Sequence, residues 1–230
     1  MRMRFTPAIL TWIAAMIGLH DINPASAQSD QNGAEEIPVA RFSASDLTGW
    51  RKTSFAGDTL YRLQHPAPGE NLALHAEAKA SASGYCRDIE IDLQRTPVVA
   101  WVWRMDQGPE GLDERSKRGD DHPLRLYFVH KAGLFGSASQ AIEYIWSMSE
   151  PVGAVWPNPY ARRVMQLVVD SGTEAAGAMQ HHKRDLRDDF HTISGIDIDR
   201  IDTVCLMTDS DQSRLIYKGR YGDIIFINKP

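Results

Sequence analysis

Apolar and polar residues alternate along most of this chain in short runs with a period of two. The clearest run covers residues 85–93, where three aliphatic side chains alternate with three acidic ones. Successive side chains of a strand point to opposite faces of its sheet, so this pattern predicts a strand with one face in solvent. Similar runs follow one another from residue 37 onward, separated by Gly, Pro, Asp and Ser. This succession is typical of an all-β protein.

One segment departs from the strand pattern. Leu186, Phe190 and Ile193 stand at i, i+4 and i+7, and Gly195 follows them. That spacing predicts one short helix near residues 185–194, ended by the glycine. Together with about eleven predicted strands, it favours a jelly-roll-type β-sandwich. We expect residues 37–230 to form this single β-sandwich domain.

The first residues read as a targeting segment. Arg2 and Arg4 precede an apolar stretch at 8–19, and Ala-Ser-Ala at 25–27 supplies a cleavage site. The apolar stretch is too short to span a bilayer as a helix, so residues 1–27 are predicted to be a signal peptide. Residues 28–36 are polar and aperiodic, which predicts a disordered lead-in. We therefore expect a periplasmic protein that is not inserted in the membrane after cleavage.

Charge and cysteine content narrow the picture further. The formal net charge is −5, and removal of Arg2, Arg4 and Asp21 leaves 23 basic against 29 acidic residues, or −6. An acidic chain of this kind is not expected to bind nucleic acid. Cys86 and Cys205 are the only cysteines. They either pair in an oxidising compartment or remain buried thiols, and the sequence leaves both possibilities open.

The sharpest candidate for chemistry is the pair of carboxylates at Asp120 and Asp121. They end a sixteen-residue loop, 106–121, that has no apolar periodicity, and loops of that length are usually functional or disordered. Arg125 and Tyr127 follow on a predicted strand and share one of its faces. The two aspartates are interpreted as calcium ligands, acceptors for sugar hydroxyls or a general base. The alternative is an acidic turn or an ion pair with a nearby arginine.

Three further carboxylates are candidate metal ligands. Asp209 and Asp211 offer oxygen atoms at alternate positions, an arrangement that suits a hard cation such as calcium. The alternative is a solvated turn after a strand. Asp223 lies directly before the apolar run 224–227, where a buried carboxylate has to be paired, hydrogen-bonded or metal-bound. We include it in the predicted calcium site.

An irregular segment around Trp156 is the predicted ligand-facing loop. The tryptophan stands among Pro, Gly and Asn residues, where strand pairing gives a large aromatic little reason to be buried, and Asn158 is close to it in the sequence. Asp120, Asp121, Arg125, Tyr127 and Asn158, with Asp209 and Asp211, are predicted to line one rim of the sandwich.

Several motifs in the chain occur together in one bacterial exported family. They are Ser-Ala-Ser-Gly at 81–84, Ile-Asp-Leu at 91–93, Trp-x-Trp-Arg at 101–104, Gly-Asp-Asp at 119–121, Leu-Arg-Leu-Tyr at 124–127, Tyr-Ile-Trp at 144–146, Asn-Pro at 158–159, Met-Thr-Asp-Ser-Asp at 207–211 and Tyr-Gly-Asp-Ile-Ile-Phe at 221–226. Over roughly residues 42–226 the chain resembles the family known as domain of unknown function 3047, and this resemblance implies no particular activity.

A looser resemblance concerns the two ends of the domain. The early Phe and Trp, with the closing Gly-Asp-Ile-x-Phe, are similar to galactose-binding-like jelly-roll carbohydrate-binding modules. That resemblance implies that the first and last strands lie close together, and that carboxylates near them hold a structural calcium.

Two functions follow as hypotheses. The first is a periplasmic, non-catalytic binding protein that recognises glycan or another polyhydroxylated cell-envelope ligand. The alternative is a carbohydrate-active enzyme, a glycosidase or lyase, that uses Asp120 or Asp121. Neighbouring aspartates on a loop do not readily point into one pocket, so a catalytic pair would need a partner from elsewhere in the chain. The oligomeric state is not predicted.

Overall fold

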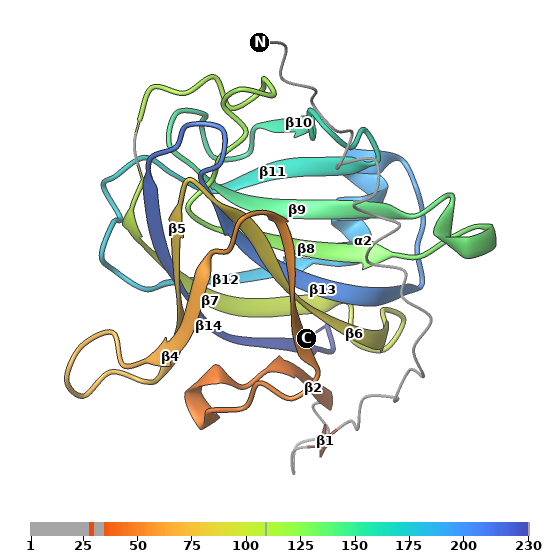
Figure 1. The fold of residues 1–230 in the computed structure, drawn as a ribbon. Helices are drawn as coiled ribbons and strands as arrows, with labels where there is room; N and C mark the ends of the chain where they lie inside the picture. The colour runs from red at the N-terminus through yellow and green to blue at the C-terminus, as the bar shows by residue number, and fades with distance from the viewer. Residues whose placement is uncertain (1–27, 30–34, 109, 230) are drawn as a thin grey trace.

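The computed structural model describes residues 28–29, 35–108 and 110–229. The predicted signal peptide, residues 1–27, lies outside them. Two sheets pack face to face and enclose the main hydrophobic core (Figure 1). The prediction of an all-β jelly-roll sandwich is confirmed.

We call the first sheet the β14 sheet, because β14 pairs with β2, β5 and β7. Its strands are β1 (Gln28–Ser29), β2 (Glu35–Ala40), β4 (Leu60–Gln64), β5 (Ala73–Lys79), β7 (Val98–Gln107), β12 (Gln180–Asp185) and β14 (Ile216–Ile227). The early strand β2 and the late strand β14 are direct neighbours, as the sequence predicted. A short 3-10 turn, η1 (Phe42–Ala44), follows β2.

We call the second sheet the β8 sheet. Its strand order is β10-β11-β9-β8-β13-β6-β3, and every pairing is antiparallel except that of β9 with β11. The strands are β3 (Trp50–Ala56), β6 (Ala82–Asp92), β8 (Arg125–His130), β9 (Gln140–Ser147), β10 (Val155–Pro157), β11 (Val164–Ser171) and β13 (Arg200–Asp209). A second 3-10 turn, η2 (Leu134–Gly136), lies between β8 and β9.

The two faces of β8 show how the alternating pattern places the site. Leu126 and Phe128 point into the core, where the Phe128 ring lies 5.9 Å from the ring of Phe226 on β14. Arg125 and Tyr127 therefore point to the outer face of the β8 sheet, away from the β14 sheet. The prediction that these two residues share a face is confirmed.

The predicted helix is present. It consists of α2 (Leu186–Asp189) and a π-helical turn, η3 (Phe190–Ser194). The Asp185 side chain caps it by accepting hydrogen bonds from the backbone N–H groups of Arg187 and Asp188. Gly195 ends it with φ 68°, a conformation that glycine adopts without strain. Within the described ranges no helix has the length and apolarity that crossing a membrane requires.

The predicted disordered lead-in, residues 28–36, is wrong at both of its ends. Gln28 and Ser29 pair with Glu36 and Glu35, and β2 already begins at Glu35. Strand pairing uses backbone hydrogen bonds, which polar residues form as well as apolar ones, so the absence of an apolar pattern did not reveal it. An ion pair of 2.9 Å between Glu35 and Arg95 also holds this end of β2.

The question of the two cysteines is resolved. Cys86 on β6 and Cys205 on β13 lie directly opposite each other with Cα atoms 4.1 Å apart, and a disulfide joins them. Both belong to a cluster on the outer face of the β8 sheet that includes Tyr127. The bond links positions 119 residues apart in the sequence, so it restricts the unfolded chain strongly.

We predict that replacing both cysteines by serine lowers the free energy of unfolding by about 2–5 kcal/mol, because the unfolded chain regains the entropy of a long loop. Urea denaturation with and without reductant measures the loss. Reductant is expected to weaken the wild type and leave the double variant unchanged. Two free thiols in denatured, unreduced wild-type protein would contradict the assignment.

Candidate functional site

The candidate site lies on the outer face of the β8 sheet, where polar side chains from neighbouring strands meet. Arg125 comes from β8, Glu143 from β9, Gln166 from β11 and Asp209 from the end of β13. Asp120 reaches the same place from the long loop that precedes β8. All five are buried. The sequence predicted a site at one rim of the sandwich. These residues lie instead on the outer face of the β8 sheet, where loops cover them.

Arg125 is the centre of this cluster, and its guanidinium uses every donor that it has. The Nε and Nη2 groups donate to the two oxygens of Asp209 at 2.7 and 2.8 Å. The Nη1 group donates to Glu143 at 2.5 Å and to the carboxylate of Asp120 at 3.3 Å, and Nη2 also donates to the backbone carbonyl of Asp120 at 2.6 Å. A guanidinium has five N–H donors, so none is left for a ligand. The interpretation of Asp120 as an ion-pair partner of Arg125 is confirmed.

The side-chain amides of Asn158 and Gln166 extend this network to the segment that follows β10 and to β11. The Nδ2 group of Asn158 lies 3.3 Å from both Asp120 and Glu143, and Gln166 donates to Asp120 at 2.8 Å. The Oδ1 atom of Asn158 accepts from the backbone of Tyr160 at 2.9 Å. Asn158 therefore joins the predicted set, and its contacts hold the loop against the sheet.

Asp121 points elsewhere, as expected for a neighbour of Asp120. It accepts hydrogen bonds from the backbone N–H groups of Gln212 at 3.3 Å and Ser213 at 2.6 Å. One oxygen of its carboxylate, with one oxygen each of Asp209 and Asp211, forms a group of three atoms that lie within 4.8 Å of one another. We call Asp121, Asp209 and Asp211 the acidic triad.

The carboxyl groups around Arg125 have different pKa values, although all of them lie near the same positive charge. Burial favours the neutral form of Asp120, but the charges of Arg125 and His122 outweigh it and lower the pKa of Asp120 to about 2. Burial raises the pKa of Asp209 to about 8 against the pull of Arg125, and burial with the charge of Asp121 raises the pKa of Asp211 to about 6. One guanidinium cannot neutralise this many buried carboxylates, so the pKa values of Asp209 and Asp211 stay above the ordinary carboxyl range.

Two buried residues that the sequence did not mark belong to the cluster. His122 lies with Nε2 3.5 Å from Asp120 and Nδ1 4.0 Å from Glu114. Burial and Arg125 act against a charged imidazole, but the carboxylates of Asp120 and Glu114 outweigh them and raise the pKa of His122. Glu114 is fixed in turn by the backbone N–H of Met148 at 2.7 Å. Both come from irregular segments, where no periodicity indicates which way a side chain points.

Glu143 and Gln166 were also missed, although they carry a sequence signal. Glu143 interrupts the apolar run 141–146 and Gln166 the apolar run 164–169, and each is completely buried. An isolated charge in such a run needs a partner, and Arg125 is the guanidinium that faces Glu143 from the next strand.

The prediction that Trp156 faces a ligand is wrong. Its side chain is buried against Ile145 and Val168, and the guanidinium of Arg115 covers its ring at 4.9 Å from the centroid. The segment that looked irregular contains β10, an edge strand that pairs Trp156 with Gln166 and turns the indole onto the sheet.

Asp223 does not join the predicted metal ligands. It lies on β14, in the other sheet, where it accepts hydrogen bonds from the backbone N–H and the hydroxyl of Ser43. The carboxylate is satisfied there, and the group that contains Asp209 and Asp211 includes Asp121 in its place. Asp209 on β13 and Asp223 on β14 are close in sequence, but the two strands belong to different sheets, which the sequence did not indicate.

A small hollow opens beside the network, with a cavity volume of about 40 Å³, which accommodates a few water molecules. Carboxylates of Asp120, Asp209 and Asp211 stand in its lining, together with the aromatic side chains of Phe55, Tyr127 and Tyr160. Tyr127 is buried, whereas Phe55 and Tyr160 are partly exposed. The hollow therefore combines acidic acceptors with aromatic walls.

Fold and site together define an all-β sandwich with a buried arginine–carboxylate network on the outer face of one sheet. Residues 48–225 match the family described as Protein of unknown function (DUF3047), and the chain belongs to that family. Among curated proteins, none matches this chain.

Solved structures with a similar fold include two glycan-related proteins. One is a family 11 carbohydrate-binding module from Clostridium thermocellum in complex with a β-1,3-1,4-mixed-linked tetrasaccharide, with 11% identity, a TM-score of 0.47 and coverage of 84% of this chain and 95% of that one. The other is the xyloglucanase domain of NopAA from Sinorhizobium fredii in complex with cellobiose, with 10% identity, a TM-score of 0.43 and coverage of 91% and 100%. Similarity at this level concerns only the path of the chain.

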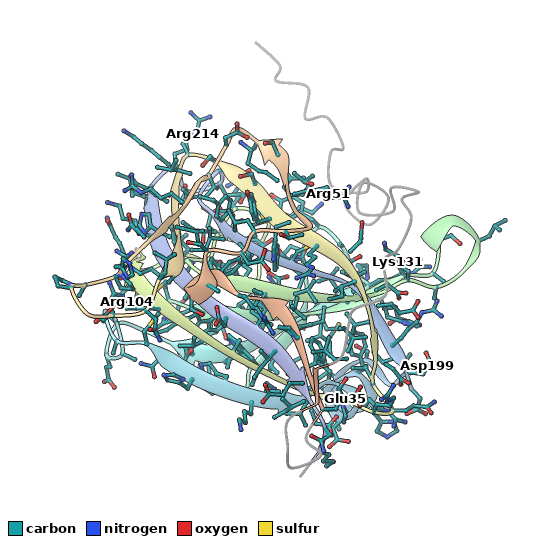
Figure 2. The ribbon with its side chains drawn as sticks, turned by 90° about the horizontal axis from the view of Figure 1, so that it is seen from below. Glu35, Arg51, Arg104, Lys131, Asp199 and Arg214 are labelled. Atoms are coloured by element: carbon teal, nitrogen blue, oxygen red, sulfur yellow. A yellow bond between two sulfur atoms is a disulfide. The ribbon has the colours of Figure 1, made fainter. Side chains whose placement is uncertain are left out.

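We predict that Arg125→Met lowers the free energy of unfolding by about 3–5 kcal/mol, because it leaves buried carboxylates without their cation. The control is Arg51→Met. Arg51 lies at the periphery (Figure 2), its side chain is half-exposed, and it pairs with Asp88, so its loss is expected to cost less than about 1 kcal/mol. Urea denaturation of both variants measures the difference, and equal losses would contradict a structural role for the network.

Proposed function

We propose that this protein is an exported, periplasmic, non-catalytic binding protein that recognises glycan or another polyhydroxylated envelope ligand at the hollow of the β8 sheet. The observation that carries the proposal is the composition of the hollow, in which Asp120, Asp209 and Asp211 stand beside the partly exposed rings of Phe55 and Tyr160. Sugars present hydroxyl donors on their edges and C–H groups on their faces. Carboxylates accept from the former and aromatic rings contact the latter.

The engagement of the carboxylates supports binding over catalysis. Both oxygens of Asp209 are bonded to Arg125, and Asp120 is bonded to Arg125 and Gln166. Groups fixed in this way hold their position. The small volume of the hollow also favours a ligand that binds at its opening. A glycosidase instead has to place two carboxyl groups on either side of the scissile bond.

Export is supported by the disulfide as well as by the N-terminal pattern. A bond between Cys86 and Cys205 requires a compartment in which thiols become oxidised, such as the periplasm. The proposed ligand is accordingly a component of the cell envelope.

One observation favours an enzyme as the second candidate. Asp120 and Asp209 both line the hollow, and their pKa values of about 2 and about 8 are pushed apart. A pair of carboxyl groups tuned in opposite directions is the arrangement that supplies a base and an acid to one reaction. In this alternative Asp209 is the proton donor and Asp120 the ionised partner of a glycosidase or lyase.

We predict that Tyr160→Ala lowers glycan affinity at least about tenfold, because a sugar ring loses its stacking surface. A glycan array with residues 28–230, followed by calorimetry on the best ligand, provides the measurement. Tyr160→Phe keeps the ring and is expected to retain binding, as is Val152→Ala at an exposed position outside the hollow. Equal affinity of Tyr160→Ala and wild type would place the ligand elsewhere.

An incubation with the same glycans distinguishes a binding protein from an enzyme. We expect no product when wild type is incubated with each bound glycan, because the carboxylates are held by Arg125. Chromatography of the glycans and a reducing-end assay provide the measurement. Cleavage by wild type that is lost in Asp209→Asn would replace the binding proposal by the enzyme alternative.

A further inference from the structure

The acidic triad has a geometry that one cation could bridge. Asp121 reaches it from the end of the long loop, Asp209 from the end of β13 and Asp211 from the turn that follows β13. An ionised carboxylate has about four lone-pair sites. Asp121 uses its two oxygens for one backbone N–H each, so both oxygens keep a free site. Asp209 Oδ2 accepts only from Arg125 and likewise keeps one.

The negative charge of the triad is not compensated locally. Arg125 pairs with Asp209, but in the described part of the chain neither Asp121 nor Asp211 forms an ion pair with a Lys, Arg or His side chain. Asp121 and Asp209 are buried, with exposed fractions of 0% and 3%. Burying charge without a partner is costly, and a cation bound between these carboxyl groups would compensate their ionised forms.

A second observation points to a ligand at this place. Three buried side-chain oxygens around the triad have no hydrogen-bond partner: Ser210 Oγ, Gln212 Oε1 and Tyr217 Oη. Gln212 donates its amide Nε2 to Asp211 at 2.6 Å, which leaves its Oε1 atom close to the same carboxylate. Two acceptor groups side by side repel each other unless a cation lies near both.

Tyr217 is completely buried and lies at the start of β14, next to the turn that holds Asp211. It lies on the same face of β14 as Tyr221, whose hydroxyl reaches the backbone of Met207 on β13 at 2.5 Å. Burial raises the pKa of the Tyr217 phenol, and the nearby charges of Asp121 and Asp209 raise it further. Because Tyr217 shares the face of Tyr221 and lies nearer the turn after β13, its buried hydroxyl points toward the end of β13, where the triad lies.

We propose that Asp121, Asp209 and Asp211 bind one calcium ion, with neutral oxygens of Gln212 and Tyr217 beside it. Calcium takes six to eight oxygen ligands in flexible geometry, which suits carboxylate, amide and hydroxyl oxygens from a loop and a turn. No sulfur or imidazole nitrogen belongs to the triad, so the donor set does not favour zinc. The site lies at the end of β13 and in the turn before β14, whereas β14 pairs with β2 at residues 224–227, and the site does not include Asp223. It does not depend on glycan recognition, because the ion would bind by itself.

The test uses residues 28–230, freed of metal with EDTA and desalted, and Ca²⁺ alone as the probe. Calorimetry is expected to show one ion per chain with a dissociation constant of about 1 mM or lower. At about 100-fold excess over that constant, the melting temperature should rise by roughly 5–10 °C. Mg²⁺ at the same concentration is expected to produce a smaller rise, because it demands a tighter octahedral geometry.

Asp211→Asn and Asp223→Asn form the matched pair of variants. Asp211 is half-buried and makes no bond to Arg125, so Asp211→Asn is expected to fold, with a melting temperature in EDTA at least equal to that of wild type. Its Ca²⁺ affinity should fall at least tenfold. Asp223→Asn should bind Ca²⁺ as wild type does. Tyr217→Phe, which keeps the buried ring, should bind severalfold more weakly.

Three results would overturn the site: no Ca²⁺ binding up to about 10 mM, an affinity unchanged by Asp211→Asn, or an equal thermal shift in sodium chloride of matched ionic strength. Failure of glycan binding would leave these measurements unaffected, so the two proposals can fail separately.

Discussion

The arrangement of the candidate site depends on the buried guanidinium of Arg125. It joins β8 to β9 through Glu143, to β13 through Asp209 and to the long loop through Asp120. Buried ion pairs are not strongly stabilising in themselves, because desolvation offsets most of the attraction. Their value here is geometric. A guanidinium with five directed donors allows one arrangement of these carboxylates, and that arrangement fixes where the loop lies on the sheet.

The same network concentrates negative charge at one place on the molecule. Among the described residues, Arg125 and His122 are the basic groups that lie close to the buried carboxylates of the cluster, and these carboxylates outnumber them. Asp209 and Asp211 belong both to the lining of the hollow and to the acidic triad. A hydroxyl-rich ligand and a hard cation are the two kinds of partner that such oxygens accept, and the proposed sites for them share these two residues.

Individual residues show how far local patterns reach. The alternation that placed Arg125 and Tyr127 on one face was sufficient, because a strand has only two faces. The spacing of Leu186 and Phe190 was sufficient for the helix. The environment of Trp156 was judged from neighbouring Pro and Gly residues, and this failed because an edge strand can be three residues long. Asp223 failed for another reason, since nearness in sequence to Asp209 does not place two strands in the same sheet.

The sequence by itself determined the class of fold, the short helix and the face on which each strand residue stands, because these follow from periodicity within a few residues. It also marked Asp120, Asp209 and Asp211 as candidate site residues, and the structure brings all three to one hollow. Only the tertiary structure decided their partners. Glu143 meets Arg125, Asp121 joins Asp209, and the disulfide closes because strands distant in sequence pair in one particular order and register. Alternation specifies which face a side chain occupies, whereas strand order and register specify which side chains occupy that face together.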